Sequence, residues 1–168
     1  MRIRYTTSLR GIDARMLTGF FEGWRVPPSP RKHLRILRGS AHVVLAIDVT
    51  RRHVVGFVNA LADGAQSAFI PLLEVLPDCR GKGIGRQLVR RMLHSLRHYP
   101  CIDLTCDPAL QAFYERCGMR RSTGMVIRDY RRGGRALDRP STCQAVLPHC
   151  IMGGQGARAW SRKKWPGP

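Results

Sequence analysis

The stretch Arg80-Gly81-Lys82-Gly83-Ile84-Gly85-Arg86 stands between a strand-like run and a segment with helical periodicity. Its three glycines, at alternate positions, free the backbone of side-chain clashes, so that successive N–H groups can converge on one anion. A helix that begins here adds a partial positive charge at the same point. Arg80, Lys82 and Arg86 would add full charges and charge-assisted hydrogen bonds. The stretch therefore predicts a binding site for a phosphate or a pyrophosphate.

Two common phosphate-binding patterns do not fit this loop. The P-loop pattern requires Ser or Thr directly after the lysine, whereas Gly83 follows Lys82 here. The dinucleotide-binding pattern places its third glycine one position after Gly85, and too few residues follow Asp103 to complete the sheet of such a fold.

The sequence around the loop predicts alternating strands and helices. The strand-like runs are 2–6, 41–49, 53–61, 68–76, 101–106 and 119–130. The segments with helical periodicity or capping residues are 13–23, 29–38, 84–98 and 109–117. Asp13 is expected to cap the first helix, and Ser29, followed by Pro30, the second. The order β-α-α-β-β-β-α-β-α-β indicates an α/β (α+β) fold in which three consecutive strands at hairpin spacing form an antiparallel meander.

Length and composition narrow the class of protein. The 168 residues are 43% hydrophobic and 24% charged, which suits one folded domain and excludes a membrane-spanning or fully disordered chain. The six cysteines form no C-x-x-C pair, and none has zinc-finger spacing to a histidine. We therefore expect a reduced, cytoplasmic protein that holds no metal.

The positive charge is large but dispersed. The formal net charge is +18, and 25 of the 29 basic residues are arginine, scattered along the whole chain. Such an excess of positive charge favours binding to nucleic acid, an anionic membrane or a phosphorylated ligand. The scattering of the basic residues along the chain argues against a dedicated nucleic-acid-binding role. Residues 131–168 hold eight basic residues and one acidic residue. We expect a folded domain over 1–130 and a basic, disordered Gly/Pro/Arg-rich tail over 131–168.

The loop also fits the pattern R/Q-x-x-G-x-G/A at every position, and there the sequence resembles the GNAT superfamily of acetyl-CoA-dependent N-acetyltransferases. A second segment, residues 113–119 (FYERCGM), resembles the family's F-Y-x-x-x-G-F stretch. The resemblance covers residues 1–130 and implies a mixed, largely antiparallel central sheet flanked by helices. It also implies acetyl-CoA as co-substrate. The residues that would bind it are Leu73, Val75, Arg80, Gly81, Lys82, Gly83, Ile84, Gly85 and Arg86.

The resemblance also assigns chemical roles. In the family, the strand before the loop separates from its neighbour, which leaves backbone N–H groups free for the thioester; Leu73, Glu74 and Val75 match those positions. Tyr114 matches the tyrosine that protonates the departing thiolate, and a phenol with an ordinary pKa of about 10 is protonated at pH 7. The alternative for Tyr114 is an ordinary half-buried aromatic residue, and Phe113 is expected in the core.

The general base is harder to assign. Family members often carry Glu or His at the positions of Phe69 or Pro71, and neither residue here titrates. Glu74 is the acid of that strand and is the candidate for a catalytic or substrate-binding role. Simple alternation directs Glu74 to the face opposite Phe69, although a bulge would reverse this. A water relay, or an amine that arrives neutral, would make a base unnecessary.

The expected reaction is direct transfer of an acetyl group to a primary amine of a small molecule or peptide in a ternary complex. The positive field disfavours polyamines, since only Glu22, Asp63 and Glu74 offer carboxylates nearby. No membrane partner is expected, and a homodimer is compatible with the sequence. The alternatives are a non-catalytic acyl-CoA-binding module and an Arg-rich nucleic-acid-binding protein, whose binding would fall steeply with salt.

Overall fold

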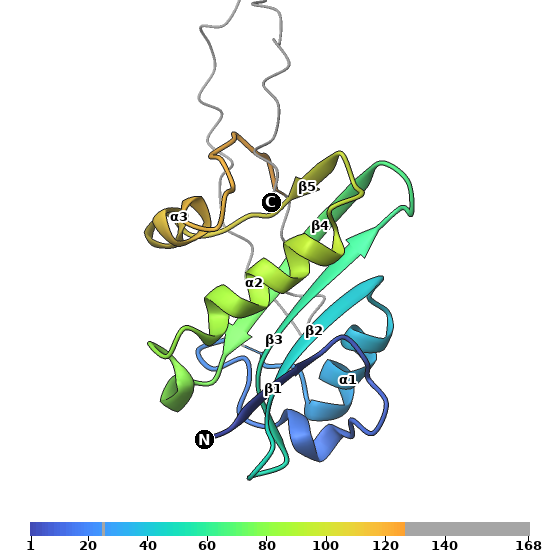
Figure 1. The fold of residues 1–168 in the computed structure, drawn as a ribbon, viewed down its shortest axis with the longest axis vertical. Coiled ribbons are helices and arrows are strands. Elements are labelled where there is room, and N and C mark those ends of the chain that lie inside the picture. The colour runs from blue at the N-terminus through green and yellow to red at the C-terminus, as the bar shows by residue number, and fades with distance from the viewer. Residues whose placement is uncertain (25, 127–168) are drawn as a thin grey trace, which may run out of the picture. The chain divides into compact units, whose positions relative to one another are not determined.

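The computed structural model describes residues 1–24 and 26–126, in which five strands form one sheet in the order β1-β2-β3-β4-β5 (Figure 1). The strands are β1 Ile3–Thr6, β2 His42–Asp48, β3 His53–Ala62, β4 Ser67–Val75 and β5 Cys101–Asp103. The first four pair antiparallel, and β5 pairs parallel to β4. The meander and the mixed, largely antiparallel sheet expected from the sequence are therefore present.

Short helices connect the strands. They are the 3₁₀ helices η1 Ala14–Leu17 and η2 Pro77–Cys79, and the α-helices α1 Pro30–Arg38, α2 Ile84–Ser95 and α3 Pro108–Glu115. Asp13 caps η1 by accepting hydrogen bonds from the N–H groups of Arg15 and Met16, and Ser29 caps α1 through the N–H of Lys32. Both capping predictions are confirmed.

The sheet buries a hydrophobic cluster on each face. Helix α2 covers one face and packs Leu88 and Met92 against Val58 of β3. Segment η1 and helix α1 cover the other face, where Leu37 belongs to the cluster around Phe57. The sheet therefore has one face covered by α2 and the opposite face covered by η1 and α1 (Figure 1).

Gly56 of β3 sets how closely α2 approaches the sheet. A Cβ atom at this position would lie 3.0 Å from Leu88 Cδ1 and 3.3 Å from Ile84 Cγ2. Such distances leave no room for a side chain between the strand and the first turns of the helix. Gly56 thereby fixes the position of the α2 N-terminus against the strands.

Two elements differ from the sequence-based expectation. The helix expected over 13–23 is only the single turn η1, because Gly19, Phe21 and Gly23 adopt positive φ angles that end any helix. The strand expected over 119–130 is absent from its described part, 119–126, where Met125 and Val126 are exposed. Residues 127–130, and the tail expected over 131–168, lie outside the described residues.

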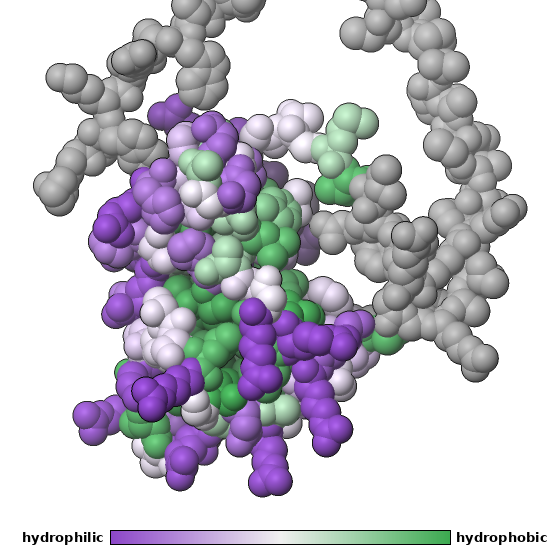
Figure 2. All heavy atoms as spheres, turned by 90° about the vertical axis from the view of Figure 1, so that its right-hand side faces the viewer, coloured by the Kyte–Doolittle hydropathy of each residue, from purple (hydrophilic) through white to green (hydrophobic). Residues whose placement is uncertain are grey.

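Hydrophilic side chains are spread over the face of the molecule that Figure 2 shows. On the face in Figure 2, hydrophilic side chains project on several sides of a central hydrophobic area and do not gather in one block.

His33 of α1 lies fully buried in an aromatic cluster. Its ring centroid lies 4.3 Å from that of Phe57, 4.9 Å from that of Phe21 and 5.2 Å from that of Phe20. Within the described part of the chain neither ring nitrogen has a hydrogen-bond partner by distance and angle. Burial lowers the pKa of the imidazole to about 4, a shift that the backbone of Leu17 partly opposes. His33 is therefore a neutral core residue.

We expect His33 to make the folded state sensitive to mild acid. Above pH 6.5 the imidazole is neutral in both the folded and the unfolded state. Between pH 6.5 and about 4 only the unfolded chain takes up the proton, so the folded state loses stability as the pH is lowered. At pH 5 this loss amounts to roughly 2 kcal/mol relative to pH 7.5. Urea unfolding of the wild type and of His33→Phe at both pH values measures it. An equal pH dependence in both proteins would contradict the assignment.

Candidate functional site

The loop between β4 and α2 forms a pocket of about 280 Å³. The residues that line it are Val75, Cys79, Arg80, Gly81, Gly83, Ile84, Gly85, Arg86 and Phe113. Most of the residues expected to bind coenzyme A thus meet in one hollow at the start of α2. Leu73 and Lys82 are not among its lining residues.

The glycines of the loop serve two different purposes. Gly81 and Gly83 adopt φ angles of +73° and +76°, a left-handed conformation that costs a residue with a side chain roughly 1–2 kcal/mol. Gly85 lies within α2, and a Cβ atom there would make ordinary contacts of 3.7 Å with Phe113 and Val75. The backbone therefore requires glycine at positions 81 and 83, while Gly85 leaves space in the pocket.

The pocket has the donors that an anion requires. The N–H groups of the first turn of a helix have no acceptor within the helix, and those of α2 begin at Ile84. The N-cap of α2 is Gly83, whose lack of a side chain leaves these N–H groups uncovered. Arg86 is exposed at the same turn and donates no hydrogen bond to any described residue. A diphosphate fits this arrangement of dipole and charge.

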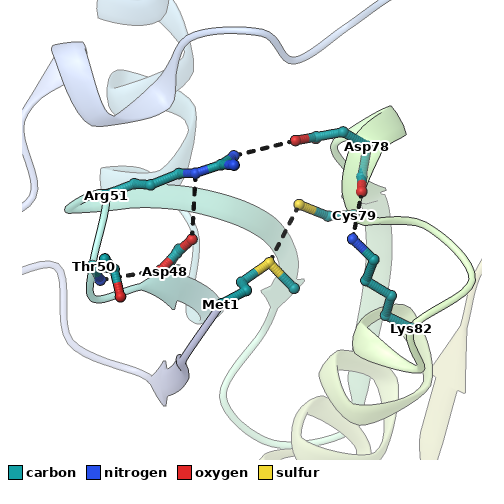
Figure 3. A network of polar contacts seen from close by, with 7 residues as sticks. All are labelled: Met1, Asp48, Thr50, Arg51, Asp78, Cys79 and Lys82. Atoms are coloured by element: carbon teal, nitrogen blue, oxygen red, sulfur yellow. Dashed lines mark hydrogen bonds and ion pairs between the residues drawn. The ribbon is translucent and has the colours of Figure 1, made fainter.

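Two other basic side chains shape the loop. Arg80 Nε donates to the carbonyl of Val75 at 3.0 Å, and Lys82 Nζ donates to the carbonyl of Asp78 at 2.8 Å. Asp78 in turn lies 3.3 Å from Arg51 of the β2–β3 turn (Figure 3). These contacts fold the loop back on the end of β4 and tie it to the neighbouring hairpin. Lys82 thus contributes a contact within the loop, and its role in binding the anion stays a prediction.

Strand β4 leaves β5 after a short contact. The two strands pair only from Ser67–Cys101 to Phe69–Asp103, so the rest of β4 has no partner strand on that side among the described residues. The N–H of Leu76 donates to Val55 of β3, and N–H groups alternate sides along a strand. The N–H groups of Leu73 and Val75 therefore point into the gap, where the resemblance expects free donors.

A bulge in β4 decides which way Glu74 points. Leu72 pairs with Asn59 and Phe69 with Leu61, so that Ile70 and Pro71 together oppose one residue of β3. The extra residue reverses the alternation and places Phe69 on the same face as Leu72 and Glu74. The expectation from simple alternation is wrong here, and the alternative with a bulge is confirmed. Pro71, which has no N–H to donate, suits such a position.

Glu74 is half-buried on the face covered by η1. Its Oε1 atom accepts a hydrogen bond from the N–H of Phe21 at 2.8 Å. Burial raises the pKa of the carboxyl group, while the Phe21 N–H and the charge of Arg80 oppose the rise. The carboxylate thus holds the segment after η1 against β4. No sequence pattern indicates this contact, because it joins residues 53 positions apart.

Tyr114 of α3 follows Phe113, which lines the pocket, and is not itself among the lining residues. Burial raises the pKa of its hydroxyl to about 12, so the phenol is protonated at neutral pH. Its ring meets the ring of Phe113 edge-on, with centroids 5.0 Å apart. Phe113, expected in the core, lines the pocket instead. Tyr114 and Glu74 make no contact with each other in the described part of the chain.

The described residues contain neither a cluster of metal-binding side chains nor a helix that could span a membrane. Within 1–24 and 26–126, no three His, Cys, Asp or Glu side chains gather closely enough to hold a metal ion. Every helix in the same ranges is too short or too polar to cross a membrane.

Comparison with known structures finds this fold repeatedly. A candidate acetyltransferase from Deinococcus radiodurans is 43% identical, with a TM-score of 0.76, and the match covers 81% of this chain and 94% of that one. A GNAT family acetyltransferase from Streptococcus pneumoniae is 21% identical, with a TM-score of 0.60 and coverage of 77% and 98%. Glucosamine-6-phosphate N-acetyltransferase from Arabidopsis thaliana, at 14% identity and a TM-score of 0.59, shares the fold over 77% of this chain and 99% of its own.

Sequence comparison gives the same family. No curated protein matches the chain. The family model for the acetyltransferase (GNAT) family matches residues 11–119, a span that contains the loop, the bulged strand and α3. Together with the D. radiodurans structure, this match shows that the chain belongs to the GNAT family of acetyltransferases.

Proposed function

We propose that this acetyltransferase transfers the acetyl group of acetyl-CoA to a primary amine of a small molecule or peptide, by direct attack in a ternary complex. The observation that carries the proposal is the pocket at the start of α2, where two left-handed glycines uncover the helix N-terminus between Arg80 and Arg86. The diphosphate of coenzyme A is the ligand that this pocket suits. From there the pantetheine arm would run into the gap beside β4.

The residues around the gap supply the steps of the transfer. The N–H groups of Leu73 and Val75 would donate to the thioester oxygen and stabilise the charge that develops there. The amine nitrogen forms a bond to the carbonyl carbon, the carbon–sulfur bond breaks, and the thiolate takes the proton of the Tyr114 hydroxyl. The extra proton on the attacking nitrogen leaves to Glu74 through water, or directly to solvent, and the Tyr114 oxygen regains its proton from solvent.

Charge favours an acceptor with one amino group. The carboxylate of Asp63 accepts hydrogen bonds from three backbone N–H groups of its own turn, which leaves Glu22 and Glu74 on the acceptor side. A molecule with three ammonium groups, such as spermidine, would leave at least one of them in the positive field of the pocket without a carboxylate to pair with. We therefore propose a monoamine, an amino acid or a peptide amine.

An amine panel with acetyl-CoA, followed by release of free thiol, tests the function. We expect turnover of monoamines above that of spermidine, and a rise in Tm when coenzyme A is added, because a ligand of the native state stabilises it. Thiol release with no amine in the panel, despite a rise in Tm, would indicate a non-catalytic acyl-CoA-binding module.

Paired glycine substitutions test the loop. Gly83→Ala forces a side chain into a left-handed conformation, and we expect the KM for acetyl-CoA to rise about tenfold. Gly85→Ala adds the same methyl group at a helical position with ordinary contacts, and we expect a change of less than about threefold. The shift in Tm with coenzyme A should follow the same order. Equal effects of the two substitutions would refute this account of the loop.

Tyr114→Phe tests the proton donor. Removing the hydroxyl should lower kcat roughly 100-fold and leave the KM for acetyl-CoA and the coenzyme-induced Tm shift unchanged. Single-turnover thiol release measures the chemical step directly. An unchanged rate would assign Tyr114 to packing alone.

A further inference from the structure

The face of the sheet that holds Glu74 changes from buried to exposed along β3 and β4. Partners in an antiparallel pair lie on the same face, so the pairs Phe57–Glu74, Asn59–Leu72 and Leu61–Phe69 form one stripe. Phe57 and Asn59 are fully buried, whereas the exposed fraction is 49% for Leu61 and 38% for Phe69. We call Leu61, Phe69 and Leu72 the apolar platform.

The apolar platform lies beside the gap. Phe69 belongs to the last pair that β4 makes with β5, so the strands separate directly after it. The bulge at Ile70–Pro71 is what turns Phe69 onto the face of Glu74 and leaves its ring exposed. An acceptor whose nitrogen reaches the gap from this face must pass over the platform.

Besides Leu61 and Phe69, Trp24 is exposed near the other end of the stripe. The ring of Trp24 meets that of Phe21 edge-on, with centroids 5.2 Å apart, and the N–H of Phe21 binds Glu74. Trp24 itself is exposed. Glu74 thus lies between an apolar loop residue and the platform. Glu22 is the neighbouring carboxylate. A carboxylate side chain bordered by apolar side chains is complementary to an ammonium group on an apolar body.

We infer that the acceptor is an amine with an apolar body, of the kind carried by phenylalanine and leucine, which packs against Leu61 and Phe69. This inference rests on the proposed function and goes beyond it by naming the substrate class and two specificity-determining residues. Exposed apolar side chains next to a reaction gap lose contact with water when such a body covers them. A polar acceptor of the same size would gain nothing there.

Amino-acid amides provide matched probes, because their amino groups share the same chemical surroundings and differ only in the side chain. We expect kcat/KM for phenylalanine amide and leucine amide to exceed that for serine amide by roughly tenfold or more. Leu61→Ser and Phe69→Ser should each reduce this preference by about fivefold, through KM for the amide, with an unchanged KM for acetyl-CoA.

Leu110→Ser is the matched control. Leu110 lies on α3, away from the platform, and its exposed fraction of 47% nearly equals that of Leu61. This substitution should leave the preference unchanged. A loss of preference in Leu110→Ser as large as in Leu61→Ser would overturn the inference, because the effect would then not come from the platform.

Other outcomes separate this inference from the proposed function. Serine amide as good as phenylalanine amide, or no turnover of either while other amines are acetylated, overturns the inference and leaves the function standing. Failure of every amine overturns both. If the serine variants change the oligomeric state in size-exclusion chromatography and not the preference, the platform is an interface between two copies of the chain.

Discussion

Strand β4 carries a bulge at the centre of the site, where two of its residues, Ile70 and Pro71, oppose a single residue of β3. This bulge coincides with the point where β4 leaves β5, after Phe69. Beyond it, the N–H groups of Leu73 and Val75 point into the gap and the side chain of Glu74 points to the face covered by η1. A regular strand would turn Glu74 away from the face of Phe69. The site therefore depends on an irregularity of the sheet, which places backbone donors and a carboxylate around one opening.

The coenzyme side of the gap depends on close packing. Gly56 admits α2 to within contact of β3, and Gly83 begins the helix without a side chain over its N–H groups. Arg80 and Lys82 then hold the loop by donating to carbonyl groups at the end of β4 and in η2. The positive charges near the pocket are thus partly structural. Arg86, which binds no described residue, remains to meet an anionic ligand directly.

Much of this arrangement could be predicted from the sequence, and the parts that could not share a cause. The loop, its glycines, the meander and the capped helix α1 follow from patterns within a few residues. The segment 13–23 does not, because Phe21, a non-glycine residue, adopts a positive φ angle there, and its N–H binds Glu74, far away in the chain. The face of Glu74 depends on the register with β3, which alternation along β4 alone cannot reveal. Phe113 is a large apolar residue of the kind found in protein cores. Its place in the pocket wall follows from the position of α3 beside Gly85, which the sequence does not indicate.

The sheet also separates the two groups that we propose for the proton transfers of the reaction. Val75 lines the pocket on the α2 side, next to Phe113 and so to Tyr114, whereas Glu74, the adjacent residue, faces η1. Successive side chains of a strand point to opposite faces, so a group that protonates sulfur and a group that accepts a proton from nitrogen can act from opposite sides of the gap. Such a division prevents a direct proton exchange between the two groups. In the proposed reaction the face with Glu74 is left to the acceptor, since the pocket proposed for the coenzyme's diphosphate is lined by Val75, on the other side of the strand.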